Sequence, residues 1–496
     1  MEVRVRYAPS PTGLQHIGGL RTALFNYLFA RSQKGVFILR LEDTDRTRCD
    51  DAYVRNLYDT FAWLGFRWDE GPDSGGPFSP YIQSERTGLY RRYAHELVAA
   101  GKAYYCFCPP ERLDAVRKER EAAHSSQTGY DRFCRTLDAQ EAAQRAQTEQ
   151  CVIRLKIPLD AATRFTDRLI GEVVWKNNDI NPDPVLLKSD GFPTYHLANI
   201  VDDHLMGITH VLRAQEWLAS TPLHVILYEA LGWEPPEFCH LPMVMGQDGK
   251  KLSKRHGATS VDEFRKNGVL PHALLNYVAL LGMSYEEGRE IYSLDELVAR
   301  FNPEKLNKAQ AVFDYKKLEW FNTQYIKEMD DEELAAQAIP FAREINLFGP
   351  NGAVPCENDR TLFIKALPLV KERAAYLGEL AEKLRYLFAE PPLPEASVFM
   401  PKKATHEDTL RLLRIGRGFV EELARLNEAD GEALVKRIAE DEDVKLGDLL
   451  MPLRVALTGT RVSPPLFGSV ILLGARRAAQ RVDKALSMLA IPPVNC

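Results

Sequence analysis

The chain has little of several features that would narrow its class. No uninterrupted apolar run approaches the roughly 20 residues that a membrane-spanning helix takes. The N-terminal segment Met1–Tyr7 carries charges where a secretory signal needs an apolar stretch. Eight cysteines scattered over 496 residues are too sparse for a disulfide-stapled secreted scaffold. We therefore expect a cytoplasmic protein with no membrane partner.

The chain also lacks a strong excess of charge of either sign. Its formal net charge is −6, and its 45% hydrophobic and 27% charged residues are ordinary for a soluble globular protein. A local basic face can exist on an acidic whole, so this value neither supports nor excludes nucleic-acid binding. At 496 residues the chain is too long for one core, and we expect several domains.

A short segment near the N-terminus, Pro9–Gly19, has the setting of a phosphate-binding turn. Before it, Val3, Val5 and Tyr7 alternate with arginines, as in a half-buried strand. After it, apolar residues from Leu20 onward follow helical spacing, so the turn ends where a helix begins. The free backbone N–H groups and the dipole at such a helix start favour a phosphate.

A lysine-rich stretch, Gly249–Gly257, predicts a mobile cationic loop. Lys251 and Lys254 stand three residues apart between glycines, so both can reach one polyphosphate as the loop closes. Basic loops are usually only solvated, and a string such as His16–Gly19 is equally weak evidence alone. The two segments together, each in a suitable structural setting, predict a nucleotide site.

The spacing of strands and helices predicts an open parallel sheet. A strand over Val36–Leu41 follows the first helix and ends in the acidic segment Glu42–Asp45, which completes a right-handed parallel unit. Ligands bind outside the carboxyl ends of parallel strands, so Ala8–Ser10 is expected beside Glu42–Asp45. The sheet resumes later as a strand over Ile208–Arg213, a helix over Thr221–Leu231 and a strand over His240–Met245.

The middle and the end of the chain differ from this pattern. From about 105 to about 187, charged helical sequence gives way to strand-like pieces such as Val152–Ile157 and Gly171–Trp175, which predicts an inserted domain of mixed structure. After the lysine-rich stretch, apolar residues at helical spacing, as in Ala273–Leu281 and Phe363–Val370, predict helices to the end. A proline-rich stretch from 390 to 401 predicts a linker between two helical units.

A series of ordered motifs runs along nearly the whole chain. They are Arg6–Gly13, His16–Gly19, Leu41–Arg46, Ser189–Asn199, Val201–Gly207, Arg213–Trp217, Lys251–Arg255, Val444–Gly447 and Pro452–Gly459. Together they resemble class I glutamyl-tRNA synthetases of the bacterial type. The resemblance implies an α/β fold: a Rossmann-like class I catalytic domain with an inserted α+β domain, followed by all-α anticodon-binding domains.

The resemblance also implies domain boundaries. Residues 1–105 and 188–255 would form the two halves of the catalytic domain, and 106–187 the inserted domain that binds the tRNA acceptor end. Residues 256–328 would form a helical stem-contact domain, and 329–496 an anticodon-binding region of two subdomains with a linker near 388–402. A monomer is the family expectation.

The implied activity is activation of glutamate by ATP, followed by transfer of the glutamyl group to the terminal adenosine of tRNA(Glu). No protein nucleophile is needed, because the enzyme aligns two anions and stabilises charge on phosphate oxygens. His16, Gly18, Lys251 and Lys254 would bind ATP, and His16 and the two lysines would act in catalysis. Mg²⁺ usually accompanies the phosphates in similar enzymes.

The resemblance places the amino acid as well. In similar enzymes it is held at the positions that match Arg6, Ala8, Ser10, Glu42, Tyr195, Asn199 and Arg213. Glu42 would pair with the ammonium group, and Arg6 and Arg213 with the side-chain carboxylate. That arrangement would favour glutamate over glutamine, whose amide cannot match two charge-assisted bonds.

Three departures from the family pattern remain. Some relatives bind zinc in the inserted domain, and Cys106, Cys108 and Cys134 resemble three of the zinc ligands. Thr136 stands where those relatives have a histidine as the fourth ligand, and His124 is a weak substitute for it. Because structural zinc takes four ligands, we predict three thiols and no metal. Gly19 replaces the second histidine of many class I enzymes, as is common in glutamate enzymes. Leu252 replaces a methionine, which conserves volume.

Arginines in the helical C-terminal third leave two interpretations open. Two groups of three arginines would either contact tRNA phosphates from a helix face or simply be solvated. They are Arg411, Arg414 and Arg417, and Arg476, Arg477 and Arg481. Whether the glutamine tRNA is also charged is left open too, because the discriminating position lies in this region.

Two rival functions were weighed against the synthetase. An enzyme of the same fold that glutamylates a modified tRNA base shares the glutamate pocket, but such enzymes resemble only the catalytic part of this chain. A non-catalytic relative that binds tRNA or a nucleotide is disfavoured by the intact His16, Lys251 and Lys254.

Overall fold

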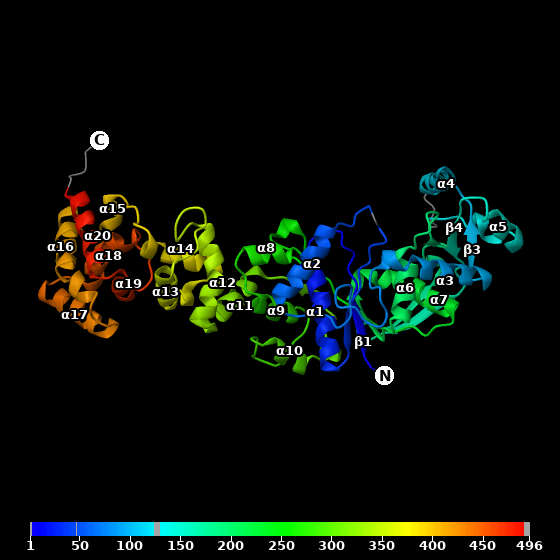
Figure 1. The fold of residues 1–496 in the computed structure, drawn as a ribbon, viewed down its shortest axis with the longest axis horizontal. Helices are drawn as coiled ribbons and strands as arrows, with labels where there is room; N and C mark the ends of the chain where they lie inside the picture. The colour runs from blue at the N-terminus through cyan, green and yellow to red at the C-terminus, as the bar shows by residue number, and fades with distance from the viewer. Residues whose placement is uncertain (1, 46, 124–128, 491–496) are drawn as a thin grey trace. The chain divides into compact units, whose positions relative to one another are not determined.

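The computed structural model describes residues 2–45, 47–123 and 129–490, which divide into two compact units (Figure 1). The first unit comprises Met1–Phe264 and Leu274–Tyr315, and the second comprises Arg265–Ala273 and Lys316–Cys496. No helix in the described part of the chain is long and apolar enough to cross a membrane.

The first unit begins with the predicted parallel strand–helix–strand. β1 (Arg4–Tyr7) pairs in parallel with β2 (Val36–Leu39), and α1 (Ile17–Ser32) connects them. Along α1, Leu20, Leu24 and Leu28 recur at helical spacing and are fully buried. The carboxyl ends of the two strands meet as expected, since the Glu42 N–H donates to the Pro9 carbonyl at 3.0 Å.

A second sheet continues the first through Thr209. Its strand order is β6-β5-β9-β8, with β5 at Ala162–Asp167, β6 at Gly171–Lys176, β8 at His210–Ala214 and β9 at Glu237–Leu241. β8 and β9 run in parallel, with Arg213 opposite His240. The Thr209 N–H donates to the Arg4 carbonyl at 2.9 Å, so β8 begins beside β1.

The segment predicted as an insertion divides between two sheets. β3 (Ala103–Cys106), β4 (Val152–Leu155) and β7 (Val185–Leu187) form an antiparallel sheet of their own. β5 and β6 instead join β9, because Asp167 pairs with Phe238 in parallel. Residues 162–176 are therefore part of the sheet that carries β8 and β9.

Helices cover these sheets. In chain order they are α2 (Asp51–Leu64), α3 (Thr87–Ala99), α4 (Pro110–Ala122), α5 (Ala139–Arg145), α6 (Tyr195–Leu205), α7 (Thr221–Leu231), α8 (Val261–Lys266), α9 (Pro271–Ala279) and α10 (Leu294–Arg300). α3, α6 and α7 share one core with β4 and β7, in which Leu155, Leu197 and Leu227 are fully buried. One short strand, β11 (Ala311–Val312), pairs with β10 (Val244–Met245), so the sequence after the lysine-rich stretch is not wholly helical.

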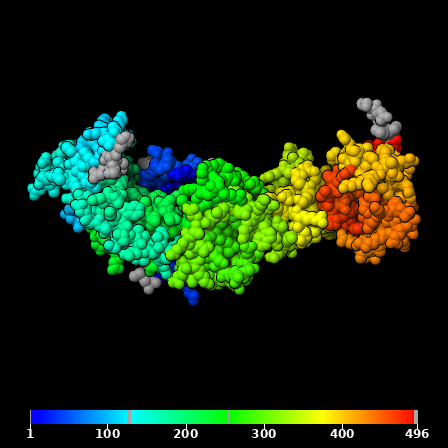
Figure 2. Space-filling view, turned by 180° about the vertical axis from the view of Figure 1, so that it is seen from behind, coloured from blue at the N-terminus to red at the C-terminus, as the bar shows by residue number. Residues whose placement is uncertain are grey.

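The second unit is helical. Its helices are α11 (Tyr315–Glu328), α12 (Asp331–Glu344), α13 (Glu357–Ala366), α14 (Leu377–Phe388), α15 (Ala396–Phe399), α16 (His406–Leu423), α17 (Glu428–Asp441), α18 (Leu446–Thr458), α19 (Leu466–Leu473) and α20 (Ala475–Leu489). α16 packs on α18 and α20, and these helices form one continuous orange-to-red body in the space-filling view (Figure 2). The proline-rich stretch between α14 and α16 holds only the short α15.

Candidate active site

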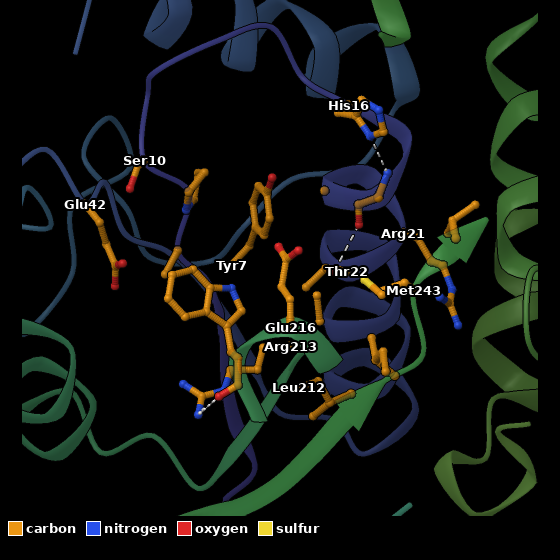
Figure 3. Close-up of a pocket in the computed structure, with 18 of the residues that line it drawn as sticks. Tyr7, Ser10, His16, Arg21, Thr22, Glu42, Leu212, Arg213, Glu216 and Met243 are labelled. Carbon is orange, nitrogen blue, oxygen red and sulfur yellow. Dashed lines mark hydrogen bonds between the residues drawn. The ribbon is translucent and has the colours of Figure 1, made fainter. Parts of the chain in front are cut away.

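A cavity of about 510 Å³ opens at the carboxyl ends of β1 and β8 and beside the start of α1 (Figure 3). Ten of the eleven residues predicted for ATP and glutamate line it: Arg6, Ala8, Ser10, His16, Gly18, Glu42, Tyr195, Asn199, Arg213 and Lys251. The eleventh, Lys254, has its backbone in a short 3-10 helix, Lys254–His256, and its side chain lies outside the described part of the chain.

His16 is the N-cap of α1, which begins at Ile17, earlier than the sequence suggested. The Gly18 N–H donates to His16 Nδ1 at 3.1 Å, so this N–H is capped by the histidine rather than free as predicted. Burial, and next the nearby Lys251, lower the pKa of the His16 imidazole. His16 is therefore held at the helix start as a neutral ring.

A steric constraint explains why position 19 holds a glycine in this fold. A Cβ atom added there would lie 2.7 Å from Tyr7 Oη and 2.9 Å from Gln15 Nε2. Those two side chains hydrogen-bond to each other under the turn. A histidine at position 19 would displace this pair, so glycine fits the local packing.

A buried ionic network forms one wall of the cavity. Arg6 donates to both oxygens of Asp203, at 3.0 and 3.3 Å, and Arg40 pairs with Asp203 and Glu42 at 2.7 and 2.9 Å. Burial would raise the pKa of Asp203, but Arg6 and Arg40 hold it below its usual value. Burial raises the pKa of the Glu42 carboxyl, against the opposing effect of Arg40. Neither Arg40 nor Asp203 was predicted as a site residue.

Glu42 keeps one oxygen available. Within the described part of the chain its two bonds, from Arg40 and from Asn199 Nδ2 at 3.1 Å, both go to Oε1. Asn199 thereby fixes the orientation of the carboxylate. The other oxygen, Oε2, can accept from a ligand.

Arg213 stands in a different environment from Arg6. It is buried, and in the described residues its guanidinium contacts only neutral acceptors, among them Tyr195 Oη and the Trp217 carbonyl. Burial lowers the pKa of this arginine. The wall therefore presents one arginine paired to a carboxylate and one without such a pair.

Lys251 forms an ion pair with Glu216 at the mouth of the cavity. Both side chains are exposed, so the pair contributes little to stability and can be exchanged for a ligand. Glu216 was not predicted as a site residue, although it lies inside the matched motif Arg213–Trp217. Figure 3 shows its carboxylate beside Tyr7, within the cavity.

Comparison with known proteins identifies the family. Residues 2–320 match the family described as tRNA synthetases class I (E and Q), catalytic domain, and residues 333–486 match an anticodon binding domain. The chain belongs to this class I synthetase family. The predicted resemblance and the predicted class I fold with a helical anticodon region are thus confirmed.

Relatives of this synthetase are similar over their full length. A glutamate–tRNA ligase of Treponema denticola is 55% identical over 98% of this chain and 99% of its own, and one of Borrelia duttonii is 48% identical over 99% and 96%. A crystal structure of a glutamate tRNA ligase from Elizabethkingia meningosepticum in complex with its amino acid is 36% identical. It covers 99% of this chain and 100% of its own, with a TM-score of 0.87.

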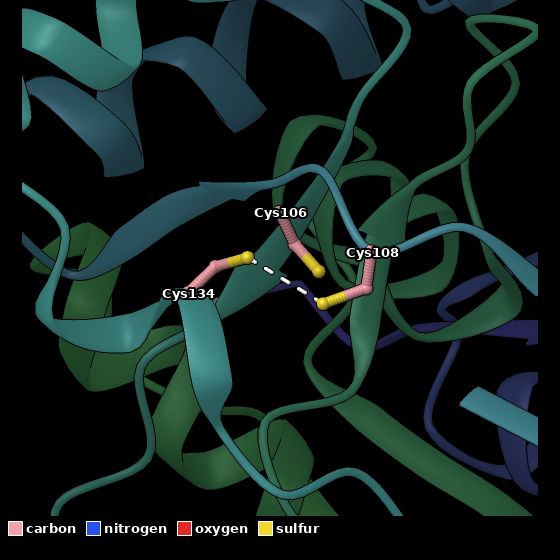
Figure 4. Close-up of side chains that lie close together, drawn as sticks. All are labelled: Cys106, Cys108 and Cys134. Atoms are coloured by element: carbon pink, nitrogen blue, oxygen red, sulfur yellow. Dashed lines mark hydrogen bonds between the residues drawn. The ribbon is translucent and has the colours of Figure 1, made fainter. Parts of the chain in front are cut away.

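The three cysteines of the inserted segment lie together (Figure 4). Their Sγ atoms are all within 4.8 Å of one another, and Cys108 and Cys134 are 3.5 Å apart. Tyr130, which the sequence analysis did not consider, places its Oη 3.3 Å from Cys106 Sγ and 3.6 Å from Cys108 Sγ. His124 lies outside the described residues. The cluster therefore offers four donor atoms rather than the three that were predicted.

Three of the C-terminal arginines show two different environments. Arg481 is buried, where it donates to the carbonyls of Leu457 and Tyr386, so it cannot meet a tRNA phosphate as suggested. Arg411 and Arg417 are more exposed and form ion pairs with Glu442 and Asp483. Of these three, only Arg411 and Arg417 are open to exchange their partners for phosphates.

Proposed function

We propose that this synthetase is a glutamate–tRNA ligase, which activates L-glutamate with ATP and transfers it to the 3′-terminal adenosine of tRNA(Glu). Arg213 is the observation that carries the proposal, since it is a buried cation without a carboxylate partner in the described residues. Such a group favours a substrate with an extra negative charge over its neutral amide.

The remaining predicted residues have compatible roles. Glu42 Oε2 would accept from the substrate ammonium, and Tyr195 and Ser10 border the same end of the cavity. His16 and the start of α1 would face the α-phosphate, where charge builds up during attack by the substrate carboxylate. Mg²⁺ would enter with the phosphates.

The lysine-rich loop would close over ATP. Lys251 would leave Glu216 for a phosphate oxygen, and Lys254 would join it there. We propose that the enzyme acts as a monomer in the cytoplasm, where tRNA is charged for protein synthesis. A mass measured by light scattering at working concentration tests the monomer.

Charging of an unmodified tRNA(Glu) transcript tests the function. With L-glutamate and ATP we expect a glutamyl ester of tRNA, AMP and pyrophosphate. A transcript whose terminal diol has been cleaved by periodate should accept no glutamate, because the 3′-terminal adenosine is the acceptor. Glutamate retained on periodate-oxidised native tRNA, which carries modified bases, would instead support base modification. No labelling of the intact transcript would contradict the proposal.

Lys254→Ala tests the loop. We expect aminoacylation to slow by about 100-fold or more, since a charge that stabilises the transition state is lost. Lys250→Ala is the matched control, because Lys250 is exposed in the same loop and does not line the cavity. Equal rates for the two variants would remove Lys254 from the mechanism.

A further inference from the structure

Arg213 has a neutral acceptor for each of its five N–H groups. Nε donates to His240 Nε2 at 3.1 Å, Nη1 to Tyr195 Oη and His224 Nδ1 at 3.3 Å each, and Nη2 to Thr221 Oγ1 at 2.7 Å and the Trp217 carbonyl at 3.4 Å. Tyr195 and Trp217 line the cavity, whereas the two histidines and Thr221 lie behind the guanidinium. The guanidinium is thus held on the side away from the cavity, and a ligand can approach it from the cavity side.

The contact with Arg213 fixes the tautomer of the His240 ring. Because Arg213 can only donate, His240 Nε2 must accept, and the ring proton sits on Nδ1. There it donates to Asp167 Oδ2 at 2.6 Å, an oxygen that also accepts the His240 backbone N–H. β5 carries Asp167 and β9 carries His240, which lies opposite Arg213 in the register with β8. The inserted segment thereby supports the arginine through one histidine.

A pair of histidines supports Arg213 in a similar way from the helical side. His224 on α7 accepts from Arg213 at Nδ1, so its Nε2 proton is donated to His196 Nδ1 on α6, 3.0 Å away. Burial first, and then the charge of Arg213, lower the pKa of His224 well below its usual value and that of His196 to about 4. Both rings stay neutral near pH 7.

We propose that His240 and His224 are positioning residues for amino-acid selection, which orient Arg213 without neutralising it. A carboxylate at either position would hold the guanidinium equally well but would remove the charge that the substrate must meet. Neutral acceptors fix one orientation and leave the full charge for a side-chain carboxylate. This inference rests on the proposed contact between Arg213 and glutamate.

Two substitutions at His224 separate positioning from packing. His224→Asn keeps an acceptor near the place of Nδ1, whereas His224→Leu keeps bulk and removes the acceptor. For the leucine variant we expect the KM for L-glutamate to rise about tenfold or more, while the KM for ATP stays within about twofold. The asparagine variant should recover most of the loss. His204→Leu, at a histidine of α6 that stacks on Trp233, is the control and should leave both KM values unchanged.

Parallel measurements on Arg213→Ala distinguish the two possible failures. If this variant binds glutamate like the unaltered enzyme, the proposed role of Arg213 is wrong. If it raises the KM for glutamate while His224→Leu does not, only the positioning role is overturned. Equal losses in the leucine and asparagine variants, or a matching rise in the KM for ATP, would likewise overturn it. A thermal melt of each variant verifies folding.

Discussion

Two arginines of the same cavity wall carry different electrostatic roles. Arg6 is paired through two bonds with Asp203, so its charge is largely compensated before any substrate enters. Arg213 has only neutral contacts in the described residues. Under the proposed function, selection against glutamine would therefore rest mainly on Arg213, whereas Arg6 would give the wall its shape and donor geometry.

The buried histidines make stability depend on pH. An unfolded chain protonates His196 and His224 near pH 6.5, whereas the folded chain keeps them neutral down to about pH 4 for His196. The unfolded state therefore binds more protons in this window, and the free energy of unfolding should fall as the pH drops from 6.5 to 4.

Urea unfolding at several pH values measures this effect. His196→Phe should flatten the slope between pH 6.5 and pH 4, because one of the titrating groups is gone. An unchanged slope in that variant would contradict the assignment of the pH dependence to His196.

Residue identities in the site were predictable where a motif carried them, and their partners were not. His16, Glu42 and Lys251 stand inside short motifs that the sequence displays. Asp203 contacts Arg6, although the two residues are 197 positions apart in the sequence, and the sequence around either residue does not predict that contact. The signal that was available is the acidic pair Asp202-Asp203, which directly follows the apolar residues Ile200 and Val201 in α6.

At the scale of elements, His16 at the start of α1 is both the N-cap of the helix and the proposed catalytic imidazole. His16→Asn should keep the cap, since asparagine is as good an N-cap as any residue, and should change the free energy of unfolding by less than about 0.5 kcal/mol. It removes the imidazole beside the α-phosphate position, so aminoacylation should slow by about 100-fold. His16→Ala should slow the reaction as much and also lose about 1 kcal/mol of stability.

Denaturant titration and single-turnover charging of the two variants make this comparison. Loss of activity in step with loss of stability would assign His16 a purely structural role. Retained activity in the asparagine variant would remove the imidazole from the reaction.

The cysteine cluster is the element where structure changes the interpretation most. Three Sγ atoms and Tyr130 Oη lie close together, so four donor atoms could reach one cation. We expect about one Zn²⁺ per chain by metal analysis, and weaker retention against a chelator in Tyr130→Phe. Three thiols that titrate freely in the unaltered protein, without zinc, would support the original prediction instead.

At the scale of the whole molecule, two units with separate cores predict two unfolding transitions. Five of the six tryptophans lie in the first unit, and Trp320 alone lies in the second. L-glutamate with a non-hydrolysable ATP analogue should raise the melting temperature of the first unit only, because the cavity lies wholly within it.

Calorimetry and tryptophan fluorescence together identify the transitions. Arg213→Ala should abolish the part of the shift that depends on glutamate. A single transition that shifts as a whole with ligand would show that the units unfold as one.

The fold class followed from sequence because periodicity and motif order extend over nearly the whole chain. The helix Thr221–Leu231 was predicted to the residue. The parallel pairing of β1 with β2 follows from the helix between them, because a helical crossover joins parallel strands. The pairing of β5 with β9 was not predictable, since it joins segments about seventy residues apart through a single register pair.

That pairing limits how freely this enzyme can exchange parts with its relatives. A chimaera that replaced 106–187 as a block would also replace Asp167, the residue behind His240 and Arg213. We expect amino-acid selectivity to change with that block, even though no cavity-lining residue had been touched. A graft that keeps residues 162–176 should preserve the original selectivity, so the segment that can be exchanged is smaller than the insertion predicted from the sequence.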